Sequence, residues 1–262
     1  MINELVNTDL LNVSFSWLCK QRKHFPDNSD VWDVRFHWNK IKPELIDELI
    51  LNTFNFQPLQ KVTKSSGEVI HLWTSIDSLV LKQLSLVLQR HLPSSKLCTH
   101  LKWHGGSKQT VTSIQSEITN NTFLFRNDVK SYYESINHEI LLDKLSVYIK
   151  DKMVMNLLSQ YLKRSVEAGG LYKDIKQGIS SGCPLSPLIS SFYLYELDNE
   201  MEDKPVFYRR YMDDIIVLSP TRWKLCKAIK TVNQHFQKLK LKQHSDKTTI
   251  GRIKNGFDFL GY

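Results

Sequence analysis

Two adjacent aspartates, Asp213 and Asp214, have the residue type and setting for metal-assisted phosphoryl transfer. Strand-forming runs at 206–210 and 215–218 flank them and predict a β-hairpin with both carboxylates at its tip. A third carboxylate, Asp128, directly follows another strong strand run at 123–127. Aspartates at a loop tip are ordinarily solvated turn residues. Strands that bring three of them together instead predict a site for two Mg²⁺ ions, because oxygen ligands suit Mg²⁺ and two metals about 4 Å apart activate a 3′-hydroxyl and stabilise leaving pyrophosphate.

The elements that must position these carboxylates form a ferredoxin-like pattern, strand-helix-strand-strand with a further helix and strand. After the 123–127 strand, Asn137 can cap a helix that runs through Lys150. A second helix over 188–201 follows Ser186 and Pro187, a cap-then-proline start. Thr221 can cap a third. The predicted core residues of the first and third helices are Leu141, Leu145, Tyr148, Leu225, Ile229, Val232, Phe236 and Leu239.

The segment before the first aspartate predicts mostly helical structure with one hairpin. A helix is expected over 43–54, and strands over 59–63 and 68–73 are joined by a turn in which Gly67 supplies a positive φ. The next helix, from about residue 77 to 88, has an amphipathic spacing. Residues 99–110 predict a polar, basic loop.

Composition agrees with a basic, globular protein. With 262 residues, 41% of them hydrophobic, the chain can bury a real core, and its net charge of +8 suits a surface that follows a phosphate backbone. Four scattered cysteines without paired spacing indicate a reducing compartment. Without a basic, apolar amino-terminal signal or an apolar run near ~20 residues, we expect a soluble cytoplasmic protein with no membrane partner. Cys98, His100 and His104 suggest zinc only weakly, because a fourth ligand at suitable spacing is lacking.

Four motifs together resemble those of bacterial reverse transcriptases of the group II intron, retron and defence-associated type. Residues 125–138 resemble the first catalytic motif, 182–187 (Gly-Cys-Pro-Leu-Ser-Pro) the Gly-x-x-x-Ser-Pro motif, 211–214 (Tyr-Met-Asp-Asp) the second catalytic motif, and 257–262 the primer grip. Their order and spacing agree with the family over about residues 55–262. A tetrapeptide alone carries little weight, whereas four ordered motifs carry much more.

The resemblance implies an α+β, right-hand polymerase fold with fingers and a palm built on a ferredoxin-like antiparallel sheet and packed helices. It divides the chain into an amino-terminal extension (1–55), fingers (56–120) and a palm (121–262), with some fingers elements interleaved around 150–180. The sequence stops where relatives begin a helical thumb, so the thumb is not expected within it.

The resemblance also implies the catalytic residues. Asp128 and Asp213 would bridge two Mg²⁺ ions, for which Mn²⁺ is a possible substitute. Asp214 would lie at the periphery, and Val129 would offer its backbone carbonyl. Lys247 matches the lysine that protonates the pyrophosphate leaving group, although an exposed loop lysine is the alternative.

Substrate contacts follow in the same way, with two departures from the family. Tyr133 matches the ring that excludes a 2′-hydroxyl, unless it is a core aromatic beside Tyr132. Ser181 stands where glutamine is usual, and no arginine accompanies the fingers lysines, which could equally belong to a solvated basic hairpin. The implied substrate-binding residues are Val129, Tyr133, Lys61, Lys64, Ser181, Gly182 and Ser186. The implied nucleic-acid contacts are Lys102, Gly105, Gly106, Lys108, Tyr211, Leu260 and Gly261.

The expected function is RNA-directed DNA polymerisation from deoxynucleoside triphosphates, with an RNA template and a DNA or RNA primer as partners. A structured non-coding RNA or a second protein subunit is a further possible partner, in a retroelement or an antiphage defence system. The departures at Ser181 and in the fingers keep open template-independent or protein-primed DNA synthesis. A catalytically silent nucleic-acid-binding scaffold is the alternative from another class.

Overall fold

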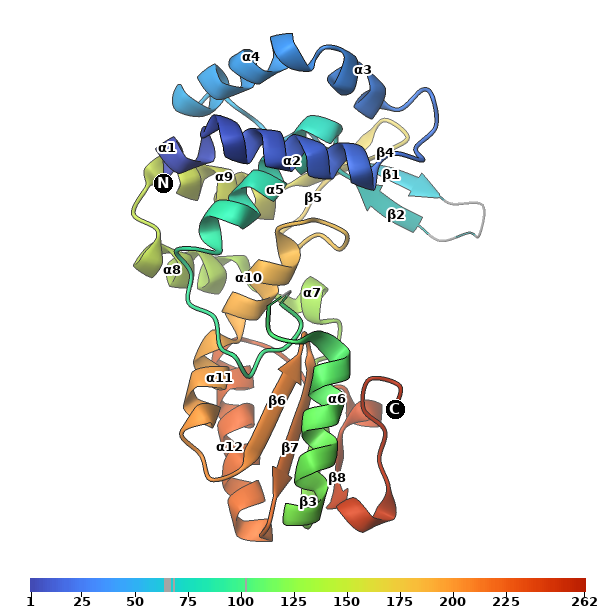
Figure 1. Ribbon diagram of the computed structural model, residues 1–262, viewed down its shortest axis with the longest axis vertical. Coiled ribbons are helices and arrows are strands. Elements are labelled where there is room, and N and C mark those ends of the chain that lie inside the picture. Colours follow the sequence, from blue (N-terminus) through green and yellow to red (C-terminus); the bar gives the residue numbers. More distant parts are fainter. Residues whose placement is uncertain (64–66, 68, 102) are drawn as a thin grey trace. The chain divides into compact units, whose positions relative to one another are not determined.

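The computed structural model describes residues 1–63, 67, 69–101 and 103–262, and it divides into two compact units (Figure 1). The first unit contains residues 1–92 and 138–186. The second contains residues 93–137 and 187–262. The chain therefore enters the second unit, returns to the first and enters the second again. No helix among the described residues is long and apolar enough to cross a bilayer.

Helix α5 (Ser75–Leu88) is the centre of the first unit. The amino-terminal helices α1 (Ile2–Leu5), α2 (Thr8–Gln21) and α3 (Asp30–Phe36) all contact it. The sequence predicts a single apolar face, but α5 is buried nearly all round because these helices pack about it. Its buried amide, Gln83, is satisfied by Ser14 Oγ at 2.6 Å and by the Leu5 carbonyl at 2.7 Å. The other helices of this unit are α4 (Trp38–Ile50), α8 (His138–Tyr148) and α9 (Lys152–Leu162).

Arg22 joins the amino-terminal helices to the start of α5. It donates to the Trp73 carbonyl and to Ser75 Oγ, both at 2.7 Å, and forms an ion pair with Asp30 at 3.2 Å. Asp30 in turn accepts the backbone N–H of Ser75 at 2.5 Å. Residues 1–50 therefore share the first unit with the segment that carries the hairpin.

A four-stranded sheet in the order β2-β1-β4-β5 completes the first unit. The expected hairpin forms from β1 (Leu59–Thr63) and β2 (Val69–Leu72), and its register places Lys61 opposite His71. Beside it, β1 pairs in parallel with β4 (Ser165–Ala168), which turns back into β5 (Leu171–Asp174).

The second unit contains an antiparallel sheet in the order β6-β7-β3-β8. Its strands are β3 (Phe123–Asn127), β6 (Phe207–Tyr211), β7 (Asp214–Ser219) and β8 (Thr249–Arg252). On one face, Leu124, Ile216 and Leu218 form a core with Ile114 of α6 (Gly106–Glu117) and with Phe259. Helix α12 (Arg222–Lys238) packs against β3 and β7 (Figure 1), and side-chain alternation leaves the opposite face of these strands for it.

The remaining elements of the chain are short. They are α7 (Tyr132–Ser135), α10 (Ser186–Tyr193), α11 (Tyr195–Glu202) and the 3₁₀ turns η1 (Ile118–Asn120), η2 (Ser245–Lys247) and η3 (Ile253–Asn255). The predicted 188–201 helix is wrong as one element, because a break at Leu194 (φ −98°, ψ 6°) separates α10 from α11. The chain passes from the first unit to the second at the start of α10.

Three further local predictions need correction. The helix expected over 43–54 is α4, which begins at Trp38 and contains Pro43, because burial of Trp38, Leu45 and Leu49 outweighs the lost proline N–H. Tyr148 is 43% exposed and is not a core residue of α8. The loop expected over 99–110 ends early, because α6 begins at Gly106.

Helix α12, which follows β7, agrees with its prediction more closely than α4 and α8 do. Thr221 accepts the backbone N–H of Lys224 at 3.3 Å and starts α12. Leu225, Val232, Phe236 and Leu239 are buried, and Ile229 is half-buried.

Candidate active site

The β6–β7 hairpin and the end of β3 bring the three aspartates to one end of the sheet. Tyr211 pairs with Asp214, which leaves Met212 and Asp213 as a two-residue turn. Neighbouring β3 pairs Asn127 with Ile215, so Asp128 leaves its strand at the same end as the turn. The sequence alone predicted strands that end next to the aspartates. The register of the sheet brings the three aspartates to the same end.

Burial and mutual repulsion mark these carboxylates as an electrostatically strained group. Burial first, and then the charges of Asp213 and Asp128, raise the pKa of Asp214 to about 6 against the opposing effect of Arg126 and Lys247. The pKa of Asp213 is also raised, first by burial and then by Asp128. A cation placed among these oxygens would relieve the repulsion.

Lys247 already contacts one member of the group. Its Nζ donates to Asp128 Oδ2 at 3.0 Å, and this hydrogen bond raises the pKa of Lys247, so the amine stays protonated. The Lys247 side chain is 53% exposed, whereas that of Asp128 is 9% exposed. The backbone N–H of His244 donates to the Asp128 carbonyl at 2.8 Å, which holds the loop that carries Lys247 beside β3.

The donor set fits a hard divalent cation, although its side chains are not arranged around one. Among residues 1–63, 67, 69–101 and 103–262, no group of three or more Asp, Glu, His or Cys side chains is arranged so that it could hold a metal ion. Three carboxylates that repel one another nevertheless offer only oxygen ligands, as Mg²⁺ prefers. Asp128, Asp213 and Asp214 would hold the ions, together with the carbonyl of Val129, whose side chain is buried at 1% exposure.

This electrostatic arrangement predicts a pH-dependent metal affinity. A carboxylate with a pKa near 6 is ionised at pH 8 and mostly protonated at pH 5, and a metal binds only the ionised form. We expect Mn²⁺ affinity, followed by electron paramagnetic resonance, to fall by about tenfold or more between these values. Asp214→Asn should bind more weakly at pH 8 and lose most of that pH dependence. An unchanged slope would show that Asp214 is not a ligand.

Two adjacent tyrosines in α7 have different surroundings. Tyr132 is 3% exposed, and its hydroxyl donates to the Ser190 carbonyl at 2.6 Å. Tyr133 is half-buried, with its ring centroid 6.1 Å from that of Tyr132. Tyr132 is therefore the buried core aromatic residue of this pair. The role of Tyr133 in excluding a 2′-hydroxyl stays a prediction.

Several predicted substrate contacts belong to the first unit. Lys61 is exposed, as are Ser181 and Gly182, and Lys64 lies outside the described residues. Gly182 has φ 75°, and a Cβ there would meet open space, so its backbone conformation is what requires glycine. Ser186 is 1% exposed, and its hydroxyl donates to the Ser180 carbonyl at 2.5 Å and lies 2.7 Å from the Tyr161 hydroxyl.

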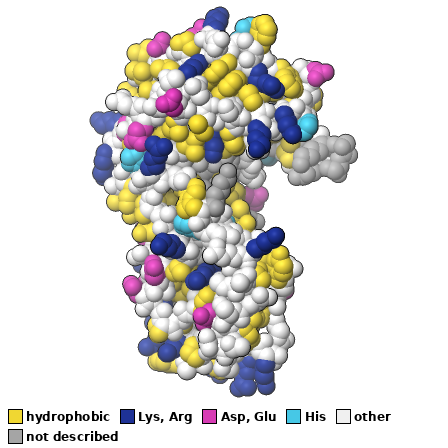
Figure 2. Space-filling model, in the orientation of Figure 1, with side chains coloured by type: hydrophobic (Ala, Val, Ile, Leu, Met, Phe, Trp, Pro, Cys, Tyr) yellow, Lys and Arg dark blue, Asp and Glu magenta, His cyan; other side chains and the backbone are white. Residues whose placement is uncertain are grey.

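The predicted nucleic-acid contacts of the second unit lie on loops and turns, at the end of β6 and on α6. Gly105 has φ 92°, a backbone conformation that L side chains rarely adopt, so this conformation favours glycine there. Gly106 opens α6 and Lys108 is exposed on it, while Lys102 lies outside the described residues. Tyr211 is half-buried, and Leu260 (φ 57°) and Gly261 (φ 83°) form a turn. Basic side chains lie on the surface of both units on the face shown in Figure 2.

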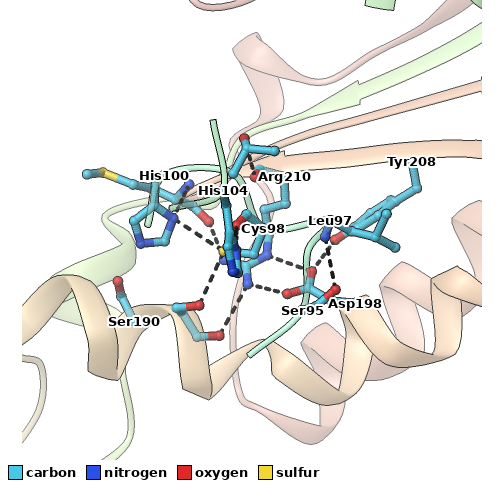
Figure 3. A network of polar contacts seen from close by, with 12 residues as sticks. Ser95, Leu97, Cys98, His100, His104, Ser190, Asp198, Tyr208 and Arg210 are labelled. Atoms are coloured by element: carbon cyan, nitrogen blue, oxygen red, sulfur yellow. Dashed lines mark hydrogen bonds and ion pairs between the residues drawn. The ribbon is translucent and has the colours of Figure 1, made fainter. Parts of the chain in front are cut away.

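Sequence reasoning missed a buried ion pair directly behind the Met212–Asp213 turn. Arg210 and Asp198, both with fully buried side chains, form a two-pronged pair, and Tyr208 donates to the same carboxylate at 2.8 Å (Figure 3). An available signal was the alternation of β6, which places Tyr208 and Arg210 on its buried face. An arginine at an inward strand position needs a partner.

The cysteine-histidine cluster beside this pair is used for hydrogen bonding. Cys98 Sγ lies 3.3 Å from His100 Nδ1 and 3.2 Å from Ser191 Oγ, while His104 Nδ1 lies 2.7 Å from the Cys98 carbonyl (Figure 3). Burial, with Arg210 nearby, lowers the pKa of His100 to about 4, so this ring is neutral near pH 7. All four cysteines, Cys19, Cys98, Cys183 and Cys226, are free thiols.

Comparison with known proteins agrees with this geometry. Residues 53–262 match the family described as "Reverse transcriptase (RNA-dependent DNA polymerase)". Protein YkfC of Escherichia coli K12 is 25% identical over 179 residues, which cover 55% of this chain and 47% of that protein. Group II intron-encoded protein LtrA of Lactococcus lactis subsp. cremoris is 24% identical over 211 residues, covering 78% and 35% of the two chains.

A solved structure shares the fold. A chain of a partial Cas6-RT-Cas1–Cas2 complex superposes with a TM-score of 0.54 at 16% identity, covering 91% of this chain and 41% of that one. The chain spans less than half the length of the curated relatives described above. The family match covers most of the chain and includes all three aspartates, so the α+β fold is that of a right-hand polymerase with its antiparallel palm sheet. On this match, the chain belongs to the reverse transcriptase (RNA-dependent DNA polymerase) family.

Proposed function

We propose that this chain is the catalytic part of an RNA-directed DNA polymerase that makes cDNA by two-metal phosphoryl transfer. The observation that carries the proposal is the meeting of Asp128, Asp213 and Asp214 at one end of the β6-β7-β3-β8 sheet. A retired site has no physical reason to keep three carboxylates whose repulsion and burial raise the pKa of Asp214 to about 6. This electrostatic cost favours an enzyme over a silent scaffold.

The residues of the site have separate tasks in this proposal. The three aspartates hold two divalent ions, which when bound activate the 3′-hydroxyl and stabilise the leaving pyrophosphate. Lys247 keeps its proton beside Asp128 and, because its side chain is 53% exposed, can turn to protonate the departing pyrophosphate. Tyr133 packs under the deoxyribose and excludes a 2′-hydroxyl. Lys61 offers a point charge to the triphosphate.

Relatives suggest the biological setting. One is named as a group II intron-encoded protein, and another belongs to a Cas6-RT-Cas1–Cas2 complex. We therefore propose a role in a bacterial retroelement or an antiphage defence system, with an RNA template, a primer and deoxynucleoside triphosphates as partners. A second protein subunit or a structured RNA is the proposed additional partner.

Primer extension on defined templates tests this function. We expect the protein to copy an RNA template from an annealed DNA primer with deoxynucleotides and Mg²⁺, and to make no product without template. Products that form without template, or that stay bound to protein after denaturation and are released by protease, would support template-independent or protein-primed synthesis instead. Nucleic-acid binding with no synthesis under any of these conditions would identify a scaffold.

Replacement of Tyr133 tests how the site selects its sugar. Tyr133→Ala should raise ribonucleotide incorporation by about tenfold or more relative to deoxynucleotide, because the ring no longer excludes the 2′-hydroxyl. Tyr133→Phe keeps the ring and should keep the selectivity, so it serves as the matched control. The ratio of kcat/KM for the two nucleotides measures the effect. If Tyr133→Ala lowers only stability and the ratio stays constant, selection occurs at another residue.

A further inference from the structure

The turn that carries the catalytic aspartates has an unfavourable backbone conformation. Met212 has φ 54°, while Asp213, the second central residue of the turn, is not among the residues with positive φ. Two-residue hairpins with this pattern usually have glycine at the first position, because a Cβ is crowded in the left-handed region. A methionine there persists only if the surrounding structure holds it.

Two side chains from outside the turn hold both polar groups of Met212. The backbone N–H of Met212 donates to His100 Nδ1 at 3.1 Å. The Met212 carbonyl accepts from Arg210 Nη1 at 2.7 Å. The residue directly before Asp213 is thus tied on its amide side and on its carbonyl side.

Both holding side chains are themselves fixed. Arg210 Nε donates to Asp198 Oδ1 at 2.8 Å, and its Nη2 donates to Asp198 Oδ2 and to the Ser191 carbonyl (Figure 3). His100 Nε2 donates to the Pro187 carbonyl at 3.0 Å, which leaves Nδ1 as the acceptor that Met212 needs. With four of its five N–H groups engaged, the guanidinium has little freedom to move.

The backbone also joins the segment before His100 to the strand that ends in the turn. The Arg210 N–H donates to the Leu97 carbonyl at 2.9 Å, and the Arg210 carbonyl accepts from the Thr99 N–H at 2.8 Å. Cys98 pairs in parallel with Arg210 as an isolated bridge. The position of His100 is therefore set by the same strand whose tip it holds.

We propose that His100 and Arg210 are positioning residues that hold Met212 in its left-handed conformation and thereby set where Asp213 and Asp214 point. The inference rests on the proposed polymerase function, because only then does this orientation matter for catalysis. Neither residue needs to touch substrate. Metal carboxylates must be held within a fraction of an ångström, and an error of about 1 Å can cost 10²-fold in rate.

A pair of His100 variants separates positioning from packing. Asparagine places its side-chain oxygen the same number of bonds from Cα as Nδ1, so His100→Asn can still accept the Met212 N–H. Glutamine places its polar atoms at the distance of Nε2, so His100→Gln keeps the Pro187 contact and loses the Met212 contact. We expect His100→Gln to lower kcat by about 10- to 100-fold with an unchanged KM for primer–template. His100→Asn should recover most of that loss.

Amide hydrogen exchange, measured on the protein without substrate, tests directly whether His100 holds the turn in place. His100→Gln should speed amide exchange of a peptide spanning residues 208–215 by about tenfold, with exchange in β3 unchanged, and His100→Asn should not. Equal kcat losses in the two variants, or no local change in exchange, would overturn the proposal. Faster exchange with unchanged kcat would also overturn it, because the turn would then be held without effect on catalysis.

The kinetic measurement and the hydrogen-exchange measurement test this proposal separately from the proposed function. A protein that fails to polymerise on any template overturns the polymerase assignment and, with it, the catalytic half of this inference. The exchange data still decide whether His100 holds the turn. A polymerase whose two His100 variants behave alike leaves the function standing and removes the positioning role.

Discussion

Asp213→Asn together with Asp214→Asn should abolish nucleotide incorporation, with an expected loss of about 10³-fold or more. A single well-placed electrostatic contact in an active site is worth about 10²–10³-fold, and this change removes two metal-ligand charges at nearly constant size. Burial and repulsion raise the pKa values of both carboxylates, so neutral replacements relieve an unfavourable interaction at pH 7. The variant should therefore melt at the same temperature as the wild type or higher in the absence of metal, and should bind primer–template normally.

A neighbouring acidic pair provides the control for this test. Glu202 and Asp203 are adjacent and exposed at the end of α11, in the same unit as Asp213 and Asp214. Glu202→Gln with Asp203→Asn makes the same change in charge and should leave primer extension unchanged. Wild-type rates in the Asp213 and Asp214 variant, measured by single-nucleotide incorporation with Mg²⁺, would contradict the polymerase assignment.

We expect Arg210→Met to destabilise the protein by about 3–5 kcal/mol, because it leaves the charge of Asp198 buried without the Arg210 guanidinium. Both side chains are 0% exposed, and Arg210 supplies two of the hydrogen bonds to that carboxylate. Urea unfolding followed by tryptophan fluorescence measures the loss. Arg210→Met combined with Asp198→Leu should recover much of the stability, and the Tyr208 hydroxyl, left without its acceptor, should keep the recovery incomplete.

The stability-recovered double variant has a second use. It still lacks the donor to the Met212 carbonyl, so it should stay well below wild-type kcat even where it is fully folded. Arg209→Met is the matched control, because half-buried Arg209 donates to its own neighbouring Tyr208 carbonyl and packs over Phe207. Its destabilisation should stay under about 1 kcal/mol. An Arg210→Met protein as stable as the wild type would show that the Arg210–Asp198 ion pair contributes no net stability.

Local sequence predicted the elements that carry the three carboxylates. The strand run before Asp128 and the runs on either side of Asp213 and Asp214 have strong β-propensity, and they form β3, β6 and β7 at nearly the expected residues. The hairpin with Gly67 and the Thr221 cap were equally readable, because turn and cap chemistry involves residues close in sequence.

Other local predictions failed where packing outweighed propensity. A helix contains Pro43, since the burial of its apolar residues compensates for one missing hydrogen bond. The basic segment before Thr110 enters a helix at Gly106, although its glycines indicated a loop. Helix α5 reads as amphipathic, yet three amino-terminal helices cover nearly all of it. In each case the deciding contacts come from residues distant in sequence.

The sequence by itself determined which carboxylates exist, which strands end in them and which family they belong to, because these properties depend on residue type and short spacing. Only the tertiary structure decided that Lys247 lies 3.0 Å from Asp128, and that Arg210 and His100 hold the two sides of Met212. These contacts join segments far apart in the chain, and strand register and side-chain burial determine which residues meet. No local propensity encodes which buried arginine meets which carboxylate, so the support of the Met212–Asp213 turn became visible only in the folded chain.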